Sequence, residues 1–403
     1  MATRLLTIAE PQGGARAALP GPAPHGWPGL RLGFRPFYLA AALLAVAAMA
    51  LWPAVFLGRL RPVGGLGATP WHAHEMIFGA MIAVVTGFLL TAGKAWTGLP
   101  TPRGAPLGAL VALWLAGRCA GLLAPAWLFA AVDGAFPVAV AFVFARLIWR
   151  ARQARNAGVA AVLSLMAAAN LAFHASALGA WRVDAMTPLH AGLALLVVLE
   201  SVIGGRVIPA FTRSATPGLV LVERKRLDRR AIAATAAGLA LGLADVAAAA
   251  PVLALAALLQ AVRLAGWKPW VARARPILWI LHLSYAWIPL GLGLLALAAT
   301  GAVARSAGVH ALAVGATGGL VMGMLTRTAR GHTGRALQVS RVEVAAYVGV
   351  MLAAALRVAA ALVPAWFVPA AIGAGVVWIA AFALYLWRFA AWLMAPRIDG
   401  KDG

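Results

Sequence analysis

Cysteine is nearly absent from this 403-residue chain, which contains only Cys119. A single cysteine excludes an internal disulfide and any cysteine-built metal centre, so a bound metal would depend mainly on histidine. Acidic residues are also scarce, with 11 Asp and Glu against 34 Lys and Arg. Because 63% of the residues are hydrophobic and only 11% are charged, no soluble domain could bury this much apolar surface. The composition therefore predicts a polytopic membrane protein.

Twelve apolar segments have roughly the 20 residues that a helix needs to cross a bilayer. They fall at about residues 36–58, 72–93, 106–123, 126–146, 158–180, 188–209, 231–249, 251–266, 276–299, 308–327, 342–363 and 366–390. This pattern predicts an all-α transmembrane domain over residues 31–395. Residues 1–30, rich in Ala, Gly and Pro, are predicted to form a disordered cytoplasmic tail, and residues 396–403 a second cytoplasmic tail.

The basic residues are distributed as an even number of spans requires. Arg118 and Arg357 lie deepest within the predicted spans, and four of the 34 Lys and Arg lie in loops on one side. The remainder lie in the tails, in the loops of the other side and at the span ends that adjoin those loops, which the positive-inside rule assigns to the cytoplasm. Both termini are therefore predicted to be cytoplasmic. Topology explains the net charge of +23, so we expect the lipid bilayer and no nucleic acid as a partner.

The first four predicted spans resemble the last four when the two stretches are laid on each other. Arg118 recurs as Arg357, and Pro125-Ala126-Trp127 recurs as Pro364-Ala365-Trp366. Further matches at one offset pair His74, Gly79, Ala80, Gly87, Lys94, Thr97 and Gly98 with His310, Gly315, Ala316, Gly323, Arg330, Thr333 and Gly334. The middle four spans match less well. We therefore predict three four-helix units of the same orientation, of which the outer two are clearly related.

His74 and His310 are the strongest ligand candidates, because they occupy equivalent positions in the two related units. Two imidazoles that face each other across an apolar gap suit axial ligation of a haem iron, here of the b type. The alternative is a pair of interfacial histidines that hydrogen-bond to loop carbonyls.

Arg118 and Arg357 are predicted to bind the same haem. Each lies roughly 10 Å below the outer membrane face, at 1.5 Å per residue, and a guanidinium at that depth needs an anion. Haem propionates would serve both arginines. Protein carboxylates within spans, such as Asp245 and Glu200, would serve one each.

A second metal centre is predicted from His72, His174 and His190, which lie with His74 in the outer half of the spans. His72 is two residues from His74, about 200° round a helix, so it cannot bind the same iron from the same face. It belongs either to the preceding loop or to a second centre. Imidazole sites suit copper, iron or zinc.

Two polar neighbours have simpler interpretations. Glu75 is predicted to lie in the first turn of its helix, where a carboxylate stabilises the macrodipole. Asn170 is one turn before His174, and it either orients that imidazole or forms a helix–helix hydrogen bond.

Several short motifs run along the chain: Gly33-Phe34-Arg35-Pro36-Phe37, Trp71-His72-Ala73-His74-Glu75-Met76, Gly87-Phe88-Leu89-Leu90-Thr91-Ala92, Gly204-Gly205-Arg206-Val207-Ile208-Pro209 with Phe211-Thr212, and Gly331-His332-Thr333-Gly334-Arg335. In combination they resemble the NnrS family, over nearly the whole chain from about residue 31. That family is described as bacterial inner-membrane proteins that contain haem and copper and are linked to nitric oxide and denitrification. The resemblance implies these cofactors here, nitric oxide or another small diatomic molecule as ligand, and a role in nitrosative stress. The ligand residues above come from topology and the repeat.

The predicted architecture is also similar to the catalytic subunit of haem–copper oxidases and nitric oxide reductases. There too, histidines on helices two and ten of twelve bind haem. This chain departs from that pattern, because its His-x-His lies on helix two and no His-His pair occurs on helix seven. The standard copper–haem reducing centre is therefore not expected.

Two classes of function follow. In the first, the protein either binds nitric oxide or exchanges electrons with it as a haem or copper oxidoreductase, with a quinol or a cytochrome as electron donor. In the competing class it transports a small anion, which the intramembrane arginines bind while histidines relay protons. The presence or absence of haem discriminates between them.

Overall fold

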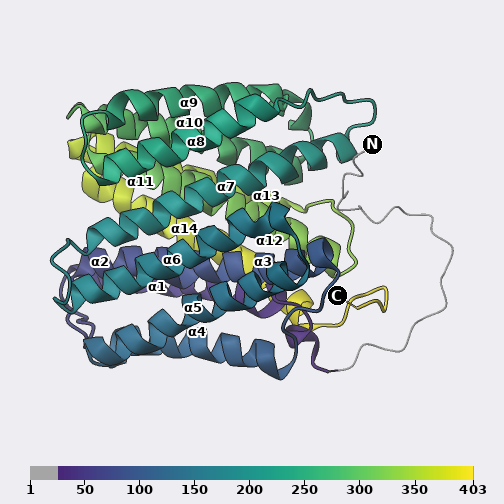
Figure 1. Cartoon of the computed structure of the whole chain (residues 1–403), viewed down its shortest axis with the longest axis horizontal. Helices are drawn as coiled ribbons and strands as arrows, with labels where there is room; N and C mark the ends of the chain where they lie inside the picture. Colours follow the sequence, from purple (N-terminus) through teal and green to yellow (C-terminus); the bar gives the residue numbers. More distant parts are fainter. Residues whose placement is uncertain (1–25, 403) are drawn as a thin grey trace. The chain divides into compact units, whose positions relative to one another are not determined.

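A computed structural model describes residues 26–402, so most of the predicted N-terminal tail lies outside the described residues. Within that range every regular element is a helix, which confirms the predicted all-α polytopic fold (Figure 1). The chain divides into two compact units. Unit 1 comprises the chain up to Ala185, Arg327–Leu337 and the chain from Leu386 onward, and unit 2 comprises Met186–Thr326 and Gln338–Tyr385.

Unit 1 contains the first helices of the chain. The long ones are α1 (Phe34–Phe56), α3 (Ile82–Thr97), α4 (Ala105–Leu123), α5 (Ala126–Arg150) and α6 (Ala157–Ala177). The short ones are the 3-10 helices η1 (Pro28–Leu30) and η3 (Ala154–Asn156), α2 (Ala68–His74) and the π-helix η2 (Glu75–Met81). α5 packs on both α4 and α6, and α3 packs on α1 and α5. This packing brings α2, α4, α5 and α6 together around one point.

Unit 2 contains the middle and later helices. The long ones are α7 (Met186–Ala215), α8 (Lys225–Leu243), α9 (Ala249–Gly266), α10 (Pro276–Ala299) and α13 (Arg341–Leu362). The short ones are η4 (Pro269–Ala272), α11 (Arg305–His310), the π-helix η5 (Ala311–Gly318) and η6 (Pro364–Trp366). α10 packs on α9, α11 and η5. α12 (Gly319–His332) and α14 (Phe367–Met394) begin in unit 2 and end in unit 1.

Eleven helices among residues 26–402 are long and apolar enough to cross a membrane. Each coincides within a few residues with a predicted span, because hydrophobic length is a local property of the sequence. The twelfth helix, α8, has 19 residues, but its first two turns carry five charged side chains: Lys225, Arg226, Asp228, Arg229 and Arg230. Its predicted bounds of 231–249 are wrong. The helix ends at Leu243, and the chain turns at Asp245, which has a positive φ of 54°.

The second and tenth predicted spans share an irregularity. The segment α2–η2–α3 changes from α to π geometry directly after His74, and α11–η5–α12 does so directly after His310. π-turns are rare and occur often at functional sites. These two segments are also the most enclosed, since 78% and 72% of their apolar windows are buried against 28–56% for the other spans. Polar side chains on them therefore need partners from protein or ligand.

A buried polar network in unit 2 explains why residue 205 is a glycine. Arg263 on α9 donates from Nε to Asp228 Oδ1 at 2.7 Å, and from Nη1 to the Ser201 carbonyl at 2.8 Å and the Tyr285 hydroxyl at 2.7 Å. A buried guanidinium is tolerated only with such partners. Gly205 on α7 leaves the space that the guanidinium fills, because a Cβ there would overlap Arg263 Nη2.

Replacing Gly205 with alanine should therefore displace Arg263 from its partners. Arg263 is buried, although its partner Asp228 is partly exposed. Leaving a buried charge without its partners costs about 3–5 kcal/mol, while alanine in place of a helical glycine gains about 1 kcal/mol. We expect a net loss of about 2–4 kcal/mol in the free energy of unfolding, measured by denaturant titration in detergent. Gly293→Ala is the matched control, since nothing lies within 4 Å of a Cβ at that helical position. Equal stabilities of the two variants would contradict this account.

Candidate metal centre

Three ionisable side chains of unit 1 meet at one buried point. His74 ends α2, Asp133 lies in α5, and His174 lies near the end of α6. Their exposed fractions are 0%, 2% and 4%. Ionisable groups enclosed by apolar helices are costly, so their convergence points to a function.

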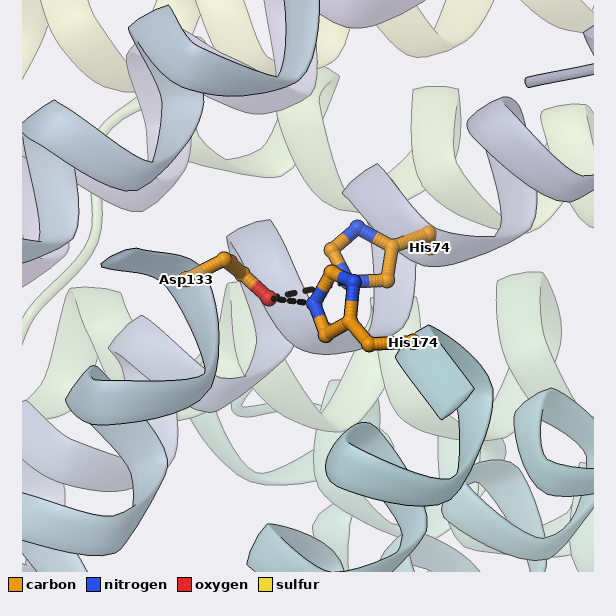
Figure 2. A group of neighbouring side chains, drawn as sticks. All are labelled: His74, Asp133 and His174. Atoms are coloured by element: carbon orange, nitrogen blue, oxygen red, sulfur yellow. Dashed lines mark hydrogen bonds and ion pairs between the residues drawn. The ribbon is translucent and has the colours of Figure 1, made fainter. Parts of the chain in front are cut away.

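The carboxylate of Asp133 points toward both imidazoles, as Figure 2 shows. Asp133 Oδ2 is 3.1 Å from His74 Nε2 and 2.7 Å from His174 Nε2. One ligand atom from each of the three residues lies within 4.8 Å of the others. Two imidazole nitrogens and one carboxylate oxygen form a donor set that suits divalent iron, copper or zinc. The three residues therefore fit a single small metal ion.

Asn170, one turn before His174 on α6, connects the carboxylate to the first imidazole. Its Nδ2 donates to Asp133 Oδ2 at 2.8 Å, and its Oδ1 lies 3.0 Å from His74 Nε2. The sequence left open whether Asn170 orients His174 or bonds to another helix. The structure gives it a hydrogen bond to α5 and one to α2.

Arg118 on α4 and Glu75 on η2 complete the group. Arg118 Nη1 donates to Glu75 Oε1 at 2.7 Å, and Nη2 forms an ion pair with Asp133. Glu75 Oε1 also lies 3.3 Å from His74 Nδ1. The prediction that Glu75 lies in a first turn and stabilises the macrodipole is wrong. The helix begins at Ala68, seven residues before Glu75, and Glu75 is buried against Arg118.

The charges of this group do not cancel. Glu75 and Asp133 carry two negative charges, and Arg118 carries one positive charge, so neutral imidazoles leave a net charge of −1. An uncompensated buried charge is strongly unfavourable, and either a proton or a metal ion must balance it. Both nitrogens of His74 face oxygen atoms of Glu75, Asp133 and Asn170. A balancing proton or metal ion therefore has acceptors on this ring and on both carboxylates.

Aromatic rings enclose the imidazoles. The His74 ring stacks on Phe173 with centroids 4.6 Å apart, and Phe129 lies edge-on to both His74, at 5.2 Å, and His174, at 4.8 Å. Removal of water by these rings strengthens every electrostatic contact at the centre. The packing of these aromatic rings also fixes the planes of the two imidazoles, so that both Nε2 atoms face Asp133.

The other two histidines predicted for a second metal lie elsewhere. The His72 ring packs on Trp52, with centroids 4.6 Å apart. His190 belongs to unit 2, where it lines a cavity of about 230 Å³ together with Asp245 and Arg305. Of the predicted set, only His174 joins the metal centre, and its imidazole partner is His74.

His310 and Arg357 lie in unit 2 and share Ser306. His310 Nδ1 is 2.8 Å from the Ser306 carbonyl, and Arg357 Nη2 donates to Ser306 Oγ at 3.2 Å. Arg118 has protein carboxylates, Glu75 and Asp133, whereas the sequence had suggested Asp245 and Glu200. The ligation of one haem by His74 and His310 joins residues of the two units, and it stays a prediction.

A comparison with protein families matches residues 28–397 to the family described as NnrS protein. The chain belongs to the NnrS family. Membership links it to nitric oxide-related function. A comparison with curated proteins gave no match.

The motifs that carried the NnrS resemblance have distinct structural roles in this chain. Trp71-His72-Ala73-His74-Glu75-Met76 supplies His74 and Glu75 to the metal centre. Gly204-Gly205 makes room for the Tyr285 ring and the Arg263 guanidinium. Gly331-His332-Thr333-Gly334-Arg335 forms the end of α12 and the turn after it, where Gly334 has a positive φ of 81°.

The residue of this NnrS-family site that sequence reasoning missed is Asp133. An aspartate in the middle of the apolar span 126–146 is itself unusual, because intramembrane carboxylates are rare and functional by default. That signal was present in the sequence. The partners of Asp133 were not, since they come from three other segments of unit 1.

Proposed function

We propose that this NnrS-family protein binds a divalent first-row metal ion, such as copper, through His74, Asp133 and His174, and a haem b through His310. Its function is to bind nitric oxide or exchange electrons with it in the bacterial inner membrane. The observation that supports the metal proposal most directly is the buried set of two imidazoles and one carboxylate within 4.8 Å. The net negative charge of the group also favours a bound cation.

The side chains around the proposed ion have complementary roles. A bound divalent copper or iron ion would supply an open coordination position and one-electron chemistry. Ligation by His74 needs the lone pair on Nε2, and Glu75 stabilises that tautomer by accepting the Nδ1 proton. Arg118 in turn holds Glu75 in place. Such carboxylate–histidine–metal arrangements orient ligands and raise their basicity.

Unit 2 supports the haem part of the proposal. A neutral His310 that donates its Nδ1–H to the Ser306 carbonyl carries its lone pair on Nε2, as metal-binding histidines do. Arg357 Nη1 and Arg118 Nε are both buried, and neither atom has a hydrogen-bond partner among the described residues. Each arginine thus keeps a donor that a haem propionate would satisfy.

Metal and haem analysis of the purified protein tests the proposal. We expect about one haem per chain, a first-row metal ion, and a visible spectrum that changes when nitric oxide is added. His310→Ala should lose the haem and keep the ion, because Nε2 would be the missing iron ligand. Visible absorption reports the haem and elemental analysis reports the ion.

His74→Ala decides between one shared centre and two separate ones. Loss of both haem and ion from this variant would support His74 as the second axial ligand of the haem bound by His310. Loss of the ion alone would support two centres. A folded wild-type protein that is colourless and metal-free would reject the proposal, and uptake of a small anion by that protein would favour a transporter.

A further inference from the structure

Three arginines surround one tryptophan at the point where α12 and α14 end in unit 1. The guanidinium carbon of Arg335 lies 4.1 Å from the centroid of the Trp392 ring, that of Arg388 lies at 4.3 Å, and that of Arg330 lies at 5.4 Å. All three fall within the distance at which a cation is attracted to an aromatic face. We call Arg330, Arg335, Arg388 and Trp392 the arginine cluster. It includes the last residue of the Gly331-Arg335 motif, which the metal centre does not use.

The cluster brings like charges together without a visible counter-ion for two of its members. The Arg388 guanidinium makes no hydrogen bond or ion pair with any of residues 26–402, and its Nε is buried. Among residues 26–402, the Arg335 guanidinium donates only to the carbonyl of Thr333, two residues away, at 3.4 Å. Burial, and then the charges of Arg388 and Arg330, lower the pKa of Arg335 below its ordinary value. Attraction to a tryptophan face offsets only part of such repulsion.

The acids of the C-terminal segment are already paired with other bases. Arg397 donates to Asp399 Oδ1 at 2.6 Å, and that hydrogen bond lowers the pKa of Asp399 below its usual range. Asp402 is 3.1 Å from Lys94 and 3.4 Å from Arg103. Burial raises the pKa of Asp402, but its contacts with these bases outweigh burial and the pKa is lowered. Neither carboxylate is therefore the anion that the cluster needs.

The position of the cluster indicates where such an anion would come from. Trp387, next to Arg388 on α14, is 74% exposed, as is typical of a tryptophan that anchors a helix at the membrane interface. Met394, the last residue of α14, is two residues beyond Trp392. Guanidinium groups bind phosphate oxygens through paired, charge-assisted hydrogen bonds. Phospholipid phosphates are the concentrated anions at this depth.

We propose that Arg335 and Arg388, oriented by the Trp392 ring and assisted by Arg330, bind a phosphate group at the membrane surface. The phosphodiester of an anionic phospholipid and free inorganic phosphate share this chemistry. A single phosphate between Arg335 and Arg388 would fill their unused donors and remove the repulsion between them. The site is separate from the metal centre in the residues it uses and in the chemistry it performs.

Lipid retention tests the site. Full-length protein in neutral detergent is titrated with phosphatidylglycerol, and bound lipid per chain is counted by native mass spectrometry. Each arginine that contacts the bound phosphate should contribute about fivefold to binding, so Arg335→Gln/Arg388→Gln should bind phosphatidylglycerol about thirtyfold more weakly. Arg335→Gln alone removes one charge from a loop without altering a helix, and it should bind about fivefold more weakly. The single variant keeps the test valid even where the double variant is unstable.

The matched control is Arg150→Gln/Arg155→Gln, which removes two exposed charges near Trp149, at the end of α5, outside the cluster. It should retain lipid as wild type does. In a second arm, inorganic phosphate replaces chloride at equal ionic strength during thermal unfolding. Phosphate that protects wild type but not Arg335→Gln/Arg388→Gln identifies free phosphate as the ligand. Equal lipid retention by both proteins, together with no phosphate protection that depends on the two arginines, overturns the proposal.

Discussion

His174→Ala should abolish metal binding at the buried centre of unit 1. His174 Nε2 is one of three ligand atoms, and its loss leaves only His74 and Asp133. Changes to residues that only orient metal ligands reduce metal affinity about 10–100-fold, so removal of a ligand should cost more than about 100-fold. The measurement is metal content by elemental analysis after dialysis against a weak chelator. Haem content should stay at the wild-type value, because the proposed haem ligand His310 is untouched.

His72→Ala is the matched control for this experiment. It removes an imidazole from the same motif, two residues from His74, but the His72 ring packs on Trp52 outside the metal centre. We expect wild-type metal content. Loss of metal from His72→Ala with full retention by His174→Ala would mean that the ion lies elsewhere, and that the sequence-based set of His72 and His190 deserves a new test.

Competition between protons and metal should accompany this binding. Ligation requires a lone pair on His74 Nε2, so an ion must displace the proton that balances the net charge of the group in its absence. Metal uptake should therefore release protons, and acidification should weaken metal binding. Proton release in unbuffered solution would accompany metal addition to wild type and vanish with His174→Ala.

The sequence predicted the helices well and their side-chain partners poorly, for a physical reason. Hydrophobic length is local, so spans such as 276–299 and 106–123 match α10 and α4 almost residue for residue. The ends of helices are harder to predict where they carry charge, because a helix can extend beyond its apolar segment into charged residues. The basic turn of α8 was assigned to a loop, although Lys225 begins the helix.

Depth in the membrane was the only three-dimensional coordinate available from the sequence. It grouped His72, His174 and His190, which share a depth but not a position around the helices. The pairing of His74 with His174 depends on how α2, α5 and α6 pack, which no single segment encodes. Glu75 was misjudged for a different reason, because its helix starts at Ala68, before the apolar run that was used to place the helix start.

The choice between structural and cofactor roles for the two predicted arginines can be decided by their different surroundings. Arg118 contacts two buried carboxylates, whereas Arg357 contacts the hydroxyl of Ser306. Removal of Arg118 leaves Glu75 and Asp133 uncompensated. Removal of Arg357 leaves no carboxylate unpaired among the residues that the structure describes. The same substitution should therefore have unequal effects on stability.

Arg118→Gln should lower the free energy of unfolding by about 3–5 kcal/mol, the cost of breaking a buried ion pair. Adding Glu75→Gln returns the group to the net charge of wild type, so the double variant should regain about 2 kcal/mol or more of the loss. Arg357→Gln is the matched control and should cost less than about 1 kcal/mol, since it removes a half-buried cation without exposing an unpaired anion. Unfolding in detergent, followed by circular dichroism, measures all four proteins. If Arg118→Gln and Arg357→Gln were equally stable, or if Glu75→Gln deepened the loss in the Arg118→Gln background, the charge balance inferred for the metal centre would be wrong.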